Sequence, residues 1–237
     1  MAQITTRAIV LRSIPYQDSH RILTLFSRDL GKLTAVAHGV LGAKSKLRSC
    51  AALFACGEYV LTTRGERMSV RSFSPDVNYF GAMDDLDATI HSSYLCALCE
   101  AALQPGESLP GLFDLLIKAM SYLNDGDYGP VNTFGAFLLL MLDDLGYAPE
   151  IDRCAICGAN KGRPKFSPPN GGLCCHRCTP QADDIPRELL RFLRAVRNGE
   201  DIIPLDEGDA KLLRRLLTDY CHHCIDRRLK PADLFDI

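Results

Sequence analysis

The sequence has 237 residues, a formal net charge of −2 and 47% hydrophobic residues, all ordinary for a globular protein. No stretch approaches the apolar run of about 20 residues that a transmembrane helix needs, and the N-terminus lacks the basic and apolar regions of a signal peptide. Eleven cysteines, an odd number in a chain of this length, argue against a disulfide framework. We therefore expect a cytoplasmic protein in a reducing compartment.

Charge is distributed unevenly along the chain. Residues 1–80 hold 11 basic and 5 acidic side chains, residues 81–152 hold one basic and 12 acidic, and residues 153–237 hold 15 basic and 12 acidic. Blocks of opposite sign suggest modules with different partners. The basic N-terminal block is the part expected to attract a polyanion, and the acidic block a basic partner. Solvated faces that happen to segregate are the alternative.

Residues 1–80 have the pattern of short strands with turns between them, one turn at Ser13–Ser19. The predicted strands are Thr5–Arg12, His20–Ser27, Gly31–Ala37, Glu58–Thr63 and Arg67–Phe73. The last two form a hairpin about Arg64-Gly65-Glu66. Five strands in 80 residues predict a small barrel. Both an OB-fold, which presents a face and loops to nucleic acid, and an SH3-like barrel fit this pattern.

The connection between the third and fourth strands, Gly39–Arg48, is glycine-containing and basic. Its cations Lys44, Lys46 and Arg48 stand at alternate positions, which an extended backbone places on one side. Such a row of cations suits phosphate groups. An ordinary solvated loop fits the same spacing equally well.

From about residue 82 the apolar residues recur with a helical period. The predicted helices are Met83–Leu103, Leu109–Leu123, Gly135–Leu145, Pro186–Arg197 and Asp209–Leu229. The third is apolar nearly all round, which is typical of a helix buried in a bundle. The predicted fold class is α+β multidomain: a barrel domain at 1–80, and a helical domain at 81–237 with a cysteine-rich insertion at about 151–182.

The insertion carries two Cys-x-x-Cys pairs, Cys154 with Cys157 and Cys175 with Cys178, seventeen residues apart. This spacing fits a four-thiolate zinc site, because each short turn presents two sulfurs to one tetrahedral ion. Four protein ligands leave no open position, so we expect one structural Zn²⁺ per chain. Cys174 is an alternative to Cys175 as the third ligand.

Two further cysteine pairs have the same spacing but lie within predicted helices. These are Cys96 with Cys99 and Cys221 with Cys224, where a free cysteine usually acts as a small buried hydrophobe. The sequence has no nucleophile elbow, phosphate-binding glycine loop or metalloprotease helix. We therefore do not expect an enzyme.

Several segments occur in a distinctive order over nearly the whole chain. They are Asp18–Ser27, Gly31–Gly39, Lys44–Leu47, Leu145–Pro149, the four cysteines, Phe166–Pro168 and Gly171–Leu173. In this order they resemble the RecO family of bacterial DNA repair and recombination mediators. The resemblance implies an N-terminal OB-fold, a helical domain and, as in some members, a zinc loop.

The resemblance also implies a function. Such proteins bind single- and double-stranded DNA, anneal complementary strands, and work with RecR and single-strand-binding protein to load the RecA recombinase. They do so without a membrane, in the cytoplasm and associated with the nucleoid. On this interpretation the phosphate contacts are Arg21, Lys32, Lys44, Lys46 and Arg48, and exposed barrel aromatics contact bases.

The interpretation leaves some points open. The barrel aromatics that could contact bases are Tyr16, Phe26, Phe54, Tyr59, Phe73, Tyr79 and Phe80. The acidic C-terminal tail of single-strand-binding protein would need a basic and apolar pocket, near Arg187–Arg197 or Lys211–Arg215. The alternative function is a zinc-containing protein-interaction scaffold that does not bind DNA directly.

Overall fold

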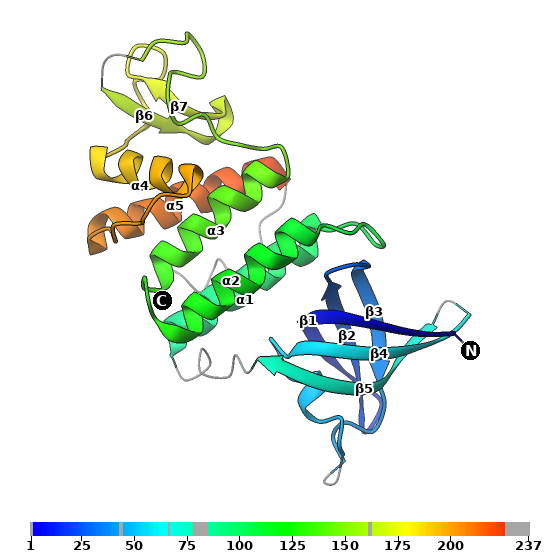
Figure 1. Ribbon diagram of the computed structural model, residues 1–237. Helices are drawn as coiled ribbons and strands as arrows, with labels where there is room; N and C mark the ends of the chain where they lie inside the picture. Colours follow the sequence, from blue (N-terminus) through cyan, green and yellow to red (C-terminus); the bar gives the residue numbers. More distant parts are fainter. Residues whose placement is uncertain (1, 43–44, 66, 78–84, 161–162, 226–237) are drawn as a thin grey trace. The chain divides into compact units, whose positions relative to one another are not determined.

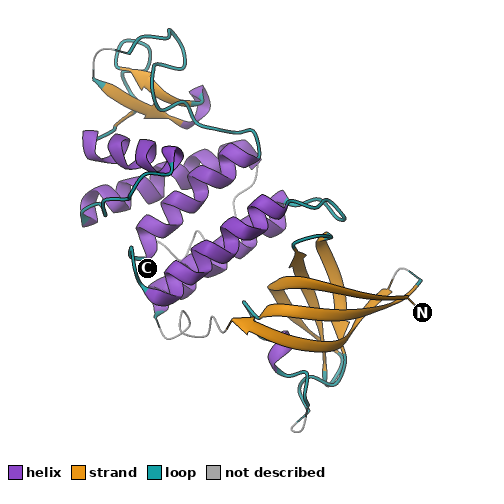
Figure 2. Cartoon of the chain, viewed as in Figure 1, coloured by secondary structure: helices purple, strands orange, loops and turns teal. Residues whose placement is uncertain are grey.

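The computed structural model describes residues 2–42, 45–65, 67–77, 85–160 and 163–225. The chain divides into two compact units, Met1–Asp125 and Gly126–Ile237. The first unit holds a β-barrel and two helices, and the second holds three helices and a small sheet (Figures 1 and 2). Within these ranges, no helix has both the length and the apolar character needed to cross a lipid bilayer.

The barrel is built from the first five strands of the chain. They are β1 (Ala2–Tyr16), β2 (His20–Ser27), β3 (Gly31–Ala37), β4 (Cys56–Arg64) and β5 (Arg67–Val77). They close in the order β1-β2-β3-β5-β4, with β3 and β5 parallel and the other pairs antiparallel. This five-stranded order matches the OB-fold alternative. The predicted fold class is therefore confirmed.

Strand β1 continues to Tyr16, through residues that the sequence assigns to a turn. A β-bulge between Val10 and Arg12 shifts its register, after which Ile14 pairs with Ile22 and Tyr16 with His20 of β2. The turn residues are therefore fewer than predicted. Pairing with β2, which local sequence does not reveal, extends the strand.

Two helices, α1 (Leu86–Ala102) and α2 (Pro110–Asp125), pack against one part of the barrel. Phe26 of β2 meets Phe113 of α2 edge to face, with ring centroids 5.4 Å apart. Beside them, the Arg28 guanidinium donates to both carboxylate oxygens of Asp114 at 3.0 and 2.9 Å. These hydrogen bonds hold the pKa of Asp114 below its ordinary value. The helices thus belong to the same compact unit as the barrel.

The C-terminal end of α1 is held by two barrel cations. Lys32 donates from Nζ to the carbonyl oxygen of Glu100 at 2.7 Å, and Arg12 pairs with the Glu100 carboxylate at 2.9 Å. The last carbonyls of a helix have no partner within the helix, so Lys32 acts as a cap.

The second unit is a helical bundle that carries a small sheet. Its helices are α3 (Pro130–Asp144), α4 (Arg187–Asn198) and α5 (Glu207–Ile225). Helix α3 is buried on most sides, as predicted, and Gly135 leaves room for Leu213 of α5. The sheet has the order β7-β6-β8, from β6 (Pro164–Ser167), β7 (Gly172–Cys175) and β8 (Asp183–Asp184). The sequence predicts an insertion here but not its strands, which are too short to show a period.

The structure also locates the change from strands to helices. Strand β5 ends at Val77 and α1 begins at Leu86, so this change falls near residue 80. The two compact units, however, meet between Asp125 and Gly126. A domain boundary at residue 80 stays a prediction.

Glycine substitutions test the junction between the barrel and the helices. Gly31 and Gly39 both have positive φ, at 69° and 65°, but a Cβ at Gly31 would overlap the Glu107 backbone, whereas at Gly39 it would meet nothing within 4 Å. We expect Gly39→Ala to lower the free energy of unfolding by about 1 kcal/mol and Gly31→Ala by about 3 kcal/mol. Urea unfolding followed by circular dichroism measures both. Equal losses of stability in the two variants would contradict the close approach of Gly31 to the Glu107 backbone.

Candidate metal centre and nucleic-acid interface

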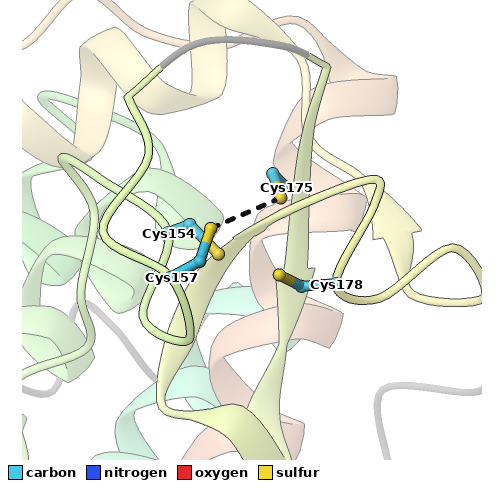
Figure 3. A group of neighbouring side chains, drawn as sticks. All are labelled: Cys154, Cys157, Cys175 and Cys178. Atoms are coloured by element: carbon cyan, nitrogen blue, oxygen red, sulfur yellow. Dashed lines mark hydrogen bonds between the residues drawn. The ribbon is translucent and has the colours of Figure 1, made fainter.

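The four cysteines of the two Cys-x-x-Cys pairs converge on one point (Figure 3). Their sulfurs all lie within 4.8 Å of one another, and the Sγ atoms of Cys157 and Cys175 are 3.8 Å apart. A tetrahedral zinc ion with Zn–S bonds of about 2.3 Å needs sulfurs about 3.8 Å apart. The donor set and its spacing therefore fit a closed metal site.

Each cysteine pair lies on a tight turn stabilised by its own backbone. In the first turn, Gly158 has a φ of 72° and donates its N–H to the Cys154 carbonyl at 2.8 Å. In the second turn, the Cys178 N–H donates to the Cys175 carbonyl at 3.0 Å. A residue with a side chain would be strained at the Gly158 conformation. Backbone hydrogen bonds therefore help to shape both turns.

Backbone pairing brings the first turn beside the second. The Leu173 N–H donates to the Glu150 carbonyl at 2.7 Å, and the Ala155 N–H donates to the Leu173 carbonyl at 2.8 Å. A Cβ at Gly172 would overlap the Glu150 backbone, so glycine is needed for this approach. The segment before the first cysteine thus runs alongside β7, which ends at Cys175.

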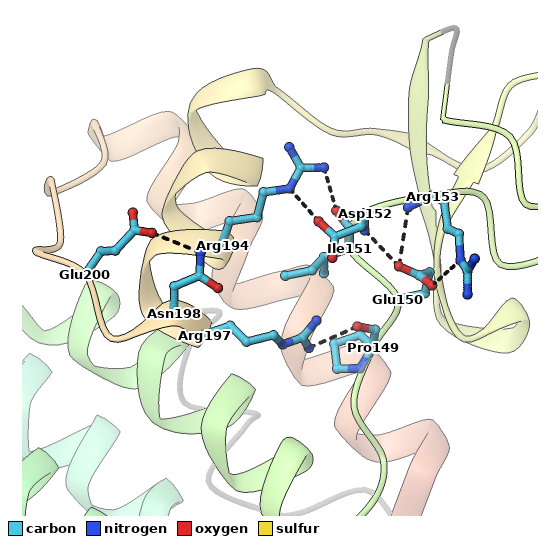
Figure 4. Close-up of polar contacts among 9 residues, drawn as sticks. All are labelled: Pro149, Glu150, Ile151, Asp152, Arg153, Arg194, Arg197, Asn198 and Glu200. Carbon is cyan, nitrogen blue, oxygen red and sulfur yellow. Dashed lines mark hydrogen bonds and ion pairs between the residues drawn. The ribbon is translucent and has the colours of Figure 1, made fainter.

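Two arginines of α4 bind the segment that leads from α3 to the first cysteine turn (Figure 4). Arg197 donates to both carboxylate oxygens of Asp143 at 2.8 Å and to the Pro149 carbonyl at 3.0 Å. Arg194 donates to the Asp152 carboxylate and to the Ile151 carbonyl, both at 2.9 Å. Bidentate pairing fixes orientation as well as distance. Helix α4 therefore positions the chain that enters the cysteine cluster.

Backbone N–H groups decide which thiols ionise most readily. The N–H of Cys157 lowers the pKa of Cys154 to about 6. The N–H of Cys178 likewise lowers the pKa of Cys175. The Cys175 sulfur, as the acceptor of a hydrogen bond, raises the pKa of Cys178 to about 12. The first cysteine of each turn is thus prepared as a thiolate, the form that binds metal.

The other cysteines do not join the four converging thiols. Cys174 is buried against Cys154 and Cys175 but does not belong to the converging set. Neighbouring residues of a strand point to opposite faces, so β7 directs only one of its two cysteines to the other ligands. Cys96 and Cys221 are buried in helices, and burial raises the pKa of Cys221 to about 12. Over the described ranges, the four-cysteine group is the only candidate metal cluster.

The five predicted phosphate contacts have different surroundings. Lys46 and Arg48 are exposed, and their side chains have no ion pair or hydrogen bond with any described residue. Arg21 is half-buried and donates to the Ser13 carbonyl at 3.3 Å. The Lys32 ammonium is engaged by the Glu100 carbonyl. Lys44 lies outside the described residues.

The outer face of β1, β2 and β3 carries apolar side chains where the helices do not cover it. Ile14 pairs with Ile22, and Ile22 pairs with Val36, so the three side chains form a row across the strands. Tyr16 pairs with His20 of β2 in the neighbouring row of outward-facing side chains. Ile14 and Tyr16 are 39% and 40% exposed. An OB-fold binds oligonucleotides on this part of its surface.

Two histidines extend this outer face. The rings of His20 and His38 meet edge to face with centroids 4.8 Å apart. The Gly39 N–H donates to Nδ1 of His20 at 2.9 Å, and His38 Nε2 lies 3.3 Å from the Ser69 hydroxyl of β5. We name the set of Ile14, Tyr16, His20, Ile22, Val36 and His38 the outer platform. Sequence analysis missed most of it, because the bulge that turns Ile14 and Tyr16 outward, and the strand pairing that places the other residues beside them, have no local signal.

The other described aromatic side chains of the barrel are less exposed than Tyr16. Phe26, Phe54 and Tyr59 are buried, and Phe73 packs against Tyr59 with ring centroids 4.5 Å apart. Tyr79 and Phe80 lie outside the described residues. Among the described aromatics of the barrel strands and their connections, Tyr16 is therefore the exposed one.

Cations border the outer platform. Arg67 and Arg71 lie on either side of Ser69 along β5, and both are exposed. Neither has an ion pair or side-chain hydrogen bond with a described residue. The platform thus combines a central apolar and aromatic surface with positive charge at its border.

Comparison with known protein families assigns both parts of the chain. The family model "Recombination protein O N terminal" matches residues 1–74, and the model "Recombination protein O C terminal" matches residues 83–232. The chain belongs to the recombination protein O family. The resemblance seen in the sequence is therefore confirmed, and the chain is a DNA repair protein of this family.

Curated relatives agree with this assignment over most of their length. The "DNA repair protein RecO" of Myxococcus xanthus is 34% identical over 233 residues, which cover 95% of this chain and 94% of the relative. The protein of the same name from Desulfitobacterium hafniense strain Y51 is 36% identical, covering 94% and 85%. That of Syntrophomonas wolfei is 31% identical, covering 80% and 77%.

Metal analysis of single variants tests the ligand set. We expect about one zinc ion per chain in the purified protein, little or none in Cys157→Ser and Cys178→Ser, and the full amount in Cys174→Ser. A serine hydroxyl at Cys157 or Cys178 removes a thiolate ligand, whereas Cys174 lies outside the converging set. Inductively coupled plasma mass spectrometry gives the stoichiometry. Metal loss from Cys174→Ser alone would show that Cys174 is the third ligand.

Proposed function

We propose that this chain is a recombination mediator that binds single- and double-stranded DNA and anneals complementary strands. The observation that carries the proposal is the outer platform, whose exposed apolar and aromatic side chains are bordered by Arg67 and Arg71, which pair with no described residue. The protein acts by binding and positioning DNA, and no covalent bond is made or broken. Membership of the recombination protein O family supports this function.

The platform favours unpaired strands. Every base of a single strand has an exposed π-face that stacks on aromatic or apolar side chains, as Tyr16, His20 and Ile14 offer here. A duplex buries those faces in its own stack, so it offers mainly phosphates to the bordering cations. Single strands are therefore held by bases and backbone together, and duplexes by backbone alone.

Cations around the platform supply the electrostatic part of binding. Lys46 and Arg48 follow the platform in the β3–η1 connection (η1, Ser49–Ala51), and Arg67 and Arg71 lie on β5. We include Lys44 and Arg21 in the proposal, Arg21 with part of its guanidinium already engaged. Each phosphate that is neutralised releases a counterion, which makes binding weaken with salt. Neutralising both strands also lowers the repulsion that opposes their annealing.

The cysteine cluster has a structural role in this proposal. Zn²⁺ bound by Cys154, Cys157, Cys175 and Cys178 would hold the two turns and the small sheet in place. Four thiolates leave no coordination position for water, so the ion would supply folding energy rather than catalysis.

Family membership suggests the protein partners. We propose that the chain works with RecR and with the acidic tail of single-strand-binding protein, and indirectly with RecA, at the nucleoid in the cytoplasm. Both stretches suggested for the tail contain cations that are already paired: Arg194 and Arg197 of α4 with Asp152 and Asp143, and Lys211 and Arg215 of α5 with Glu207 and Asp183. The exposed acidic positions of residues 81–152 are proposed to contact proteins rather than DNA.

Annealing of two complementary oligonucleotides without nucleotide, over a series of salt concentrations, tests the function. The proposal expects annealing that is faster than the spontaneous reaction and that slows as salt rises. A protein-interaction scaffold would neither bind the strands nor change their annealing rate, even at low salt.

Removal of the loop cations tests the electrostatic part. For Lys46→Ala with Arg48→Ala, we expect the slope of log K against log salt for a single strand to fall by about 1.4, since two phosphate contacts are lost. Lys32→Ala is the control, because its ammonium caps α1: the slope should stay and stability should fall. Fluorescence anisotropy measures binding. An unchanged slope in the double variant would exclude this loop from the DNA site.

Substitution of Tyr16 tests the base contacts. We expect Tyr16→Ala to weaken single-strand binding about tenfold, because stacking of one base is worth roughly 1–3 kcal/mol, and to leave duplex binding nearly unchanged. Tyr16→Phe keeps the ring and should bind like the parent. Equal losses for single strand and duplex would contradict base stacking at this position.

A further inference from the structure

The second unit has a cleft of about 330 Å³ between the cysteine cluster and helix α4. Its walls include Cys154 and Cys175 of the cluster and Leu190 of α4. Four arginines also line it: Arg163, Arg187, Arg191 and Arg194. None of these arginines belongs to the barrel site described above.

Two of the four arginines are free to bind an anion. Arg163 pairs with Asp184 and Arg194 with Asp152. Arg187 and Arg191 are exposed, and neither has an ion pair or a side-chain hydrogen bond with a described residue. They stand one helical turn apart, so their side chains lie on the same face of α4.

The cleft contains little negative charge to offset these cations. Asp152 is the one carboxylate among its lining residues that the structure describes, and it already accepts a hydrogen bond from Arg194. Glu188, the acidic neighbour on α4, lines an adjacent groove, which Arg191 and Arg194 also line. The cleft is therefore complementary in charge to an anionic ligand.

We infer that this cleft binds the phosphodiester backbone of a second DNA strand. The inference rests on the proposed function and adds a second strand-binding site to the barrel site. Arginine pairs well with phosphate, because its planar guanidinium donates two parallel hydrogen bonds. Two arginines on one helix face, neither paired with a described residue, therefore suit consecutive charges of a nucleic acid backbone.

The lining of the cleft suits a strand whose bases stay free. Its described lining residues include no tyrosine, phenylalanine or histidine, and its apolar members, such as Ala159, Leu173 and Leu190, are aliphatic. Without a stacking platform, the cleft holds a strand by its backbone alone. A strand held in this way keeps its bases available for pairing.

Positive charge continues beyond the cleft. Arg177 follows the cleft residue Cys175 by two positions in the second cysteine turn, and it is exposed. A series of cations longer than the cleft favours a polymer with one charge per unit over a short acidic peptide. This is why we assign the cleft to DNA rather than to a protein tail.

The experiment compares two double variants with equal loss of charge. Arg187→Ala with Arg191→Ala removes the free cations of the cleft, and Lys211→Ala with Arg214→Ala removes two cations of α5. A strand fixed to beads is first saturated with protein, and capture of a second, non-complementary labelled strand is then measured over a salt series. First-strand affinity is measured separately by anisotropy.

We expect the cleft variant to capture the second strand at least tenfold less well, with first-strand affinity within about threefold of the parent. Its salt slope for second-strand capture should fall by about 1.4, as two lost phosphate contacts require. The α5 variant should behave like the parent. Arg187→Lys with Arg191→Lys keeps both charges and should retain most of the capture, which separates loss of charge from loss of fold.

The outcomes distinguish this inference from the proposed function. If the parent protein binds no first strand, the proposed function fails. If the parent anneals strands and the cleft variant captures the second strand as well as the α5 variant does, only the inference is overturned. It is also overturned if the cleft variant captures DNA normally but loses binding of a nine-residue peptide rich in Asp and Phe, since the cleft would then be a peptide pocket.

Discussion

The β-bulge between Val10 and Arg12 is the constraint on which the barrel's surface depends. Before it, Ala8 and Val10 point into the barrel; after it, Ile14 and Tyr16 point outward. Because side chains alternate along a strand, one extra residue moves every later side chain of that strand to the opposite face of the sheet. Without the bulge, Ile14 and Tyr16 would face the barrel interior, and the platform would lose both of its β1 side chains. A single backbone irregularity thus adds the exposed tyrosine to the surface that we propose for base contacts.

The cysteine cluster helps to stabilise a sheet that is too small to have a core of its own. The sheet β6–β7–β8 has strands of four, four and two residues, too few to bury a core of their own. The cluster, the backbone pairing at Glu150 and the arginine pairs of α4 together hold it. Because Cys154 and Cys175 also line the arginine cleft, the metal centre would fix one wall of that cleft. Its structural role and the proposed second strand site are therefore linked.

Sequence alone predicted the elements that have a strong local signal. The bounds of β2 and β3 and the four-cysteine group follow from alternation and spacing, and the structure agrees. Lys32 shows the limit of such reasoning: it reads as a phosphate contact, yet its amine caps a helix that begins more than 50 residues later. Its partner depends on tertiary packing, which no local pattern encodes. The sequence places Arg187 and Arg191 in a stretch suggested for a protein tail, and the cleft that they line beside the cysteine cluster could not be predicted, for the same reason.

The two proposed DNA sites differ in the part of the strand that they hold, and this difference has a consequence for annealing. The outer platform would bind the bases of one strand, and the arginine cleft would bind the phosphate backbone of the other. Two base-binding sites would hide both strands from each other, while two backbone sites would give no preference for unpaired DNA. One of each keeps one strand available for pairing while the other is held. As pairing proceeds, the bases leave the platform for the duplex stack, so the product loses the contacts that selected its first strand.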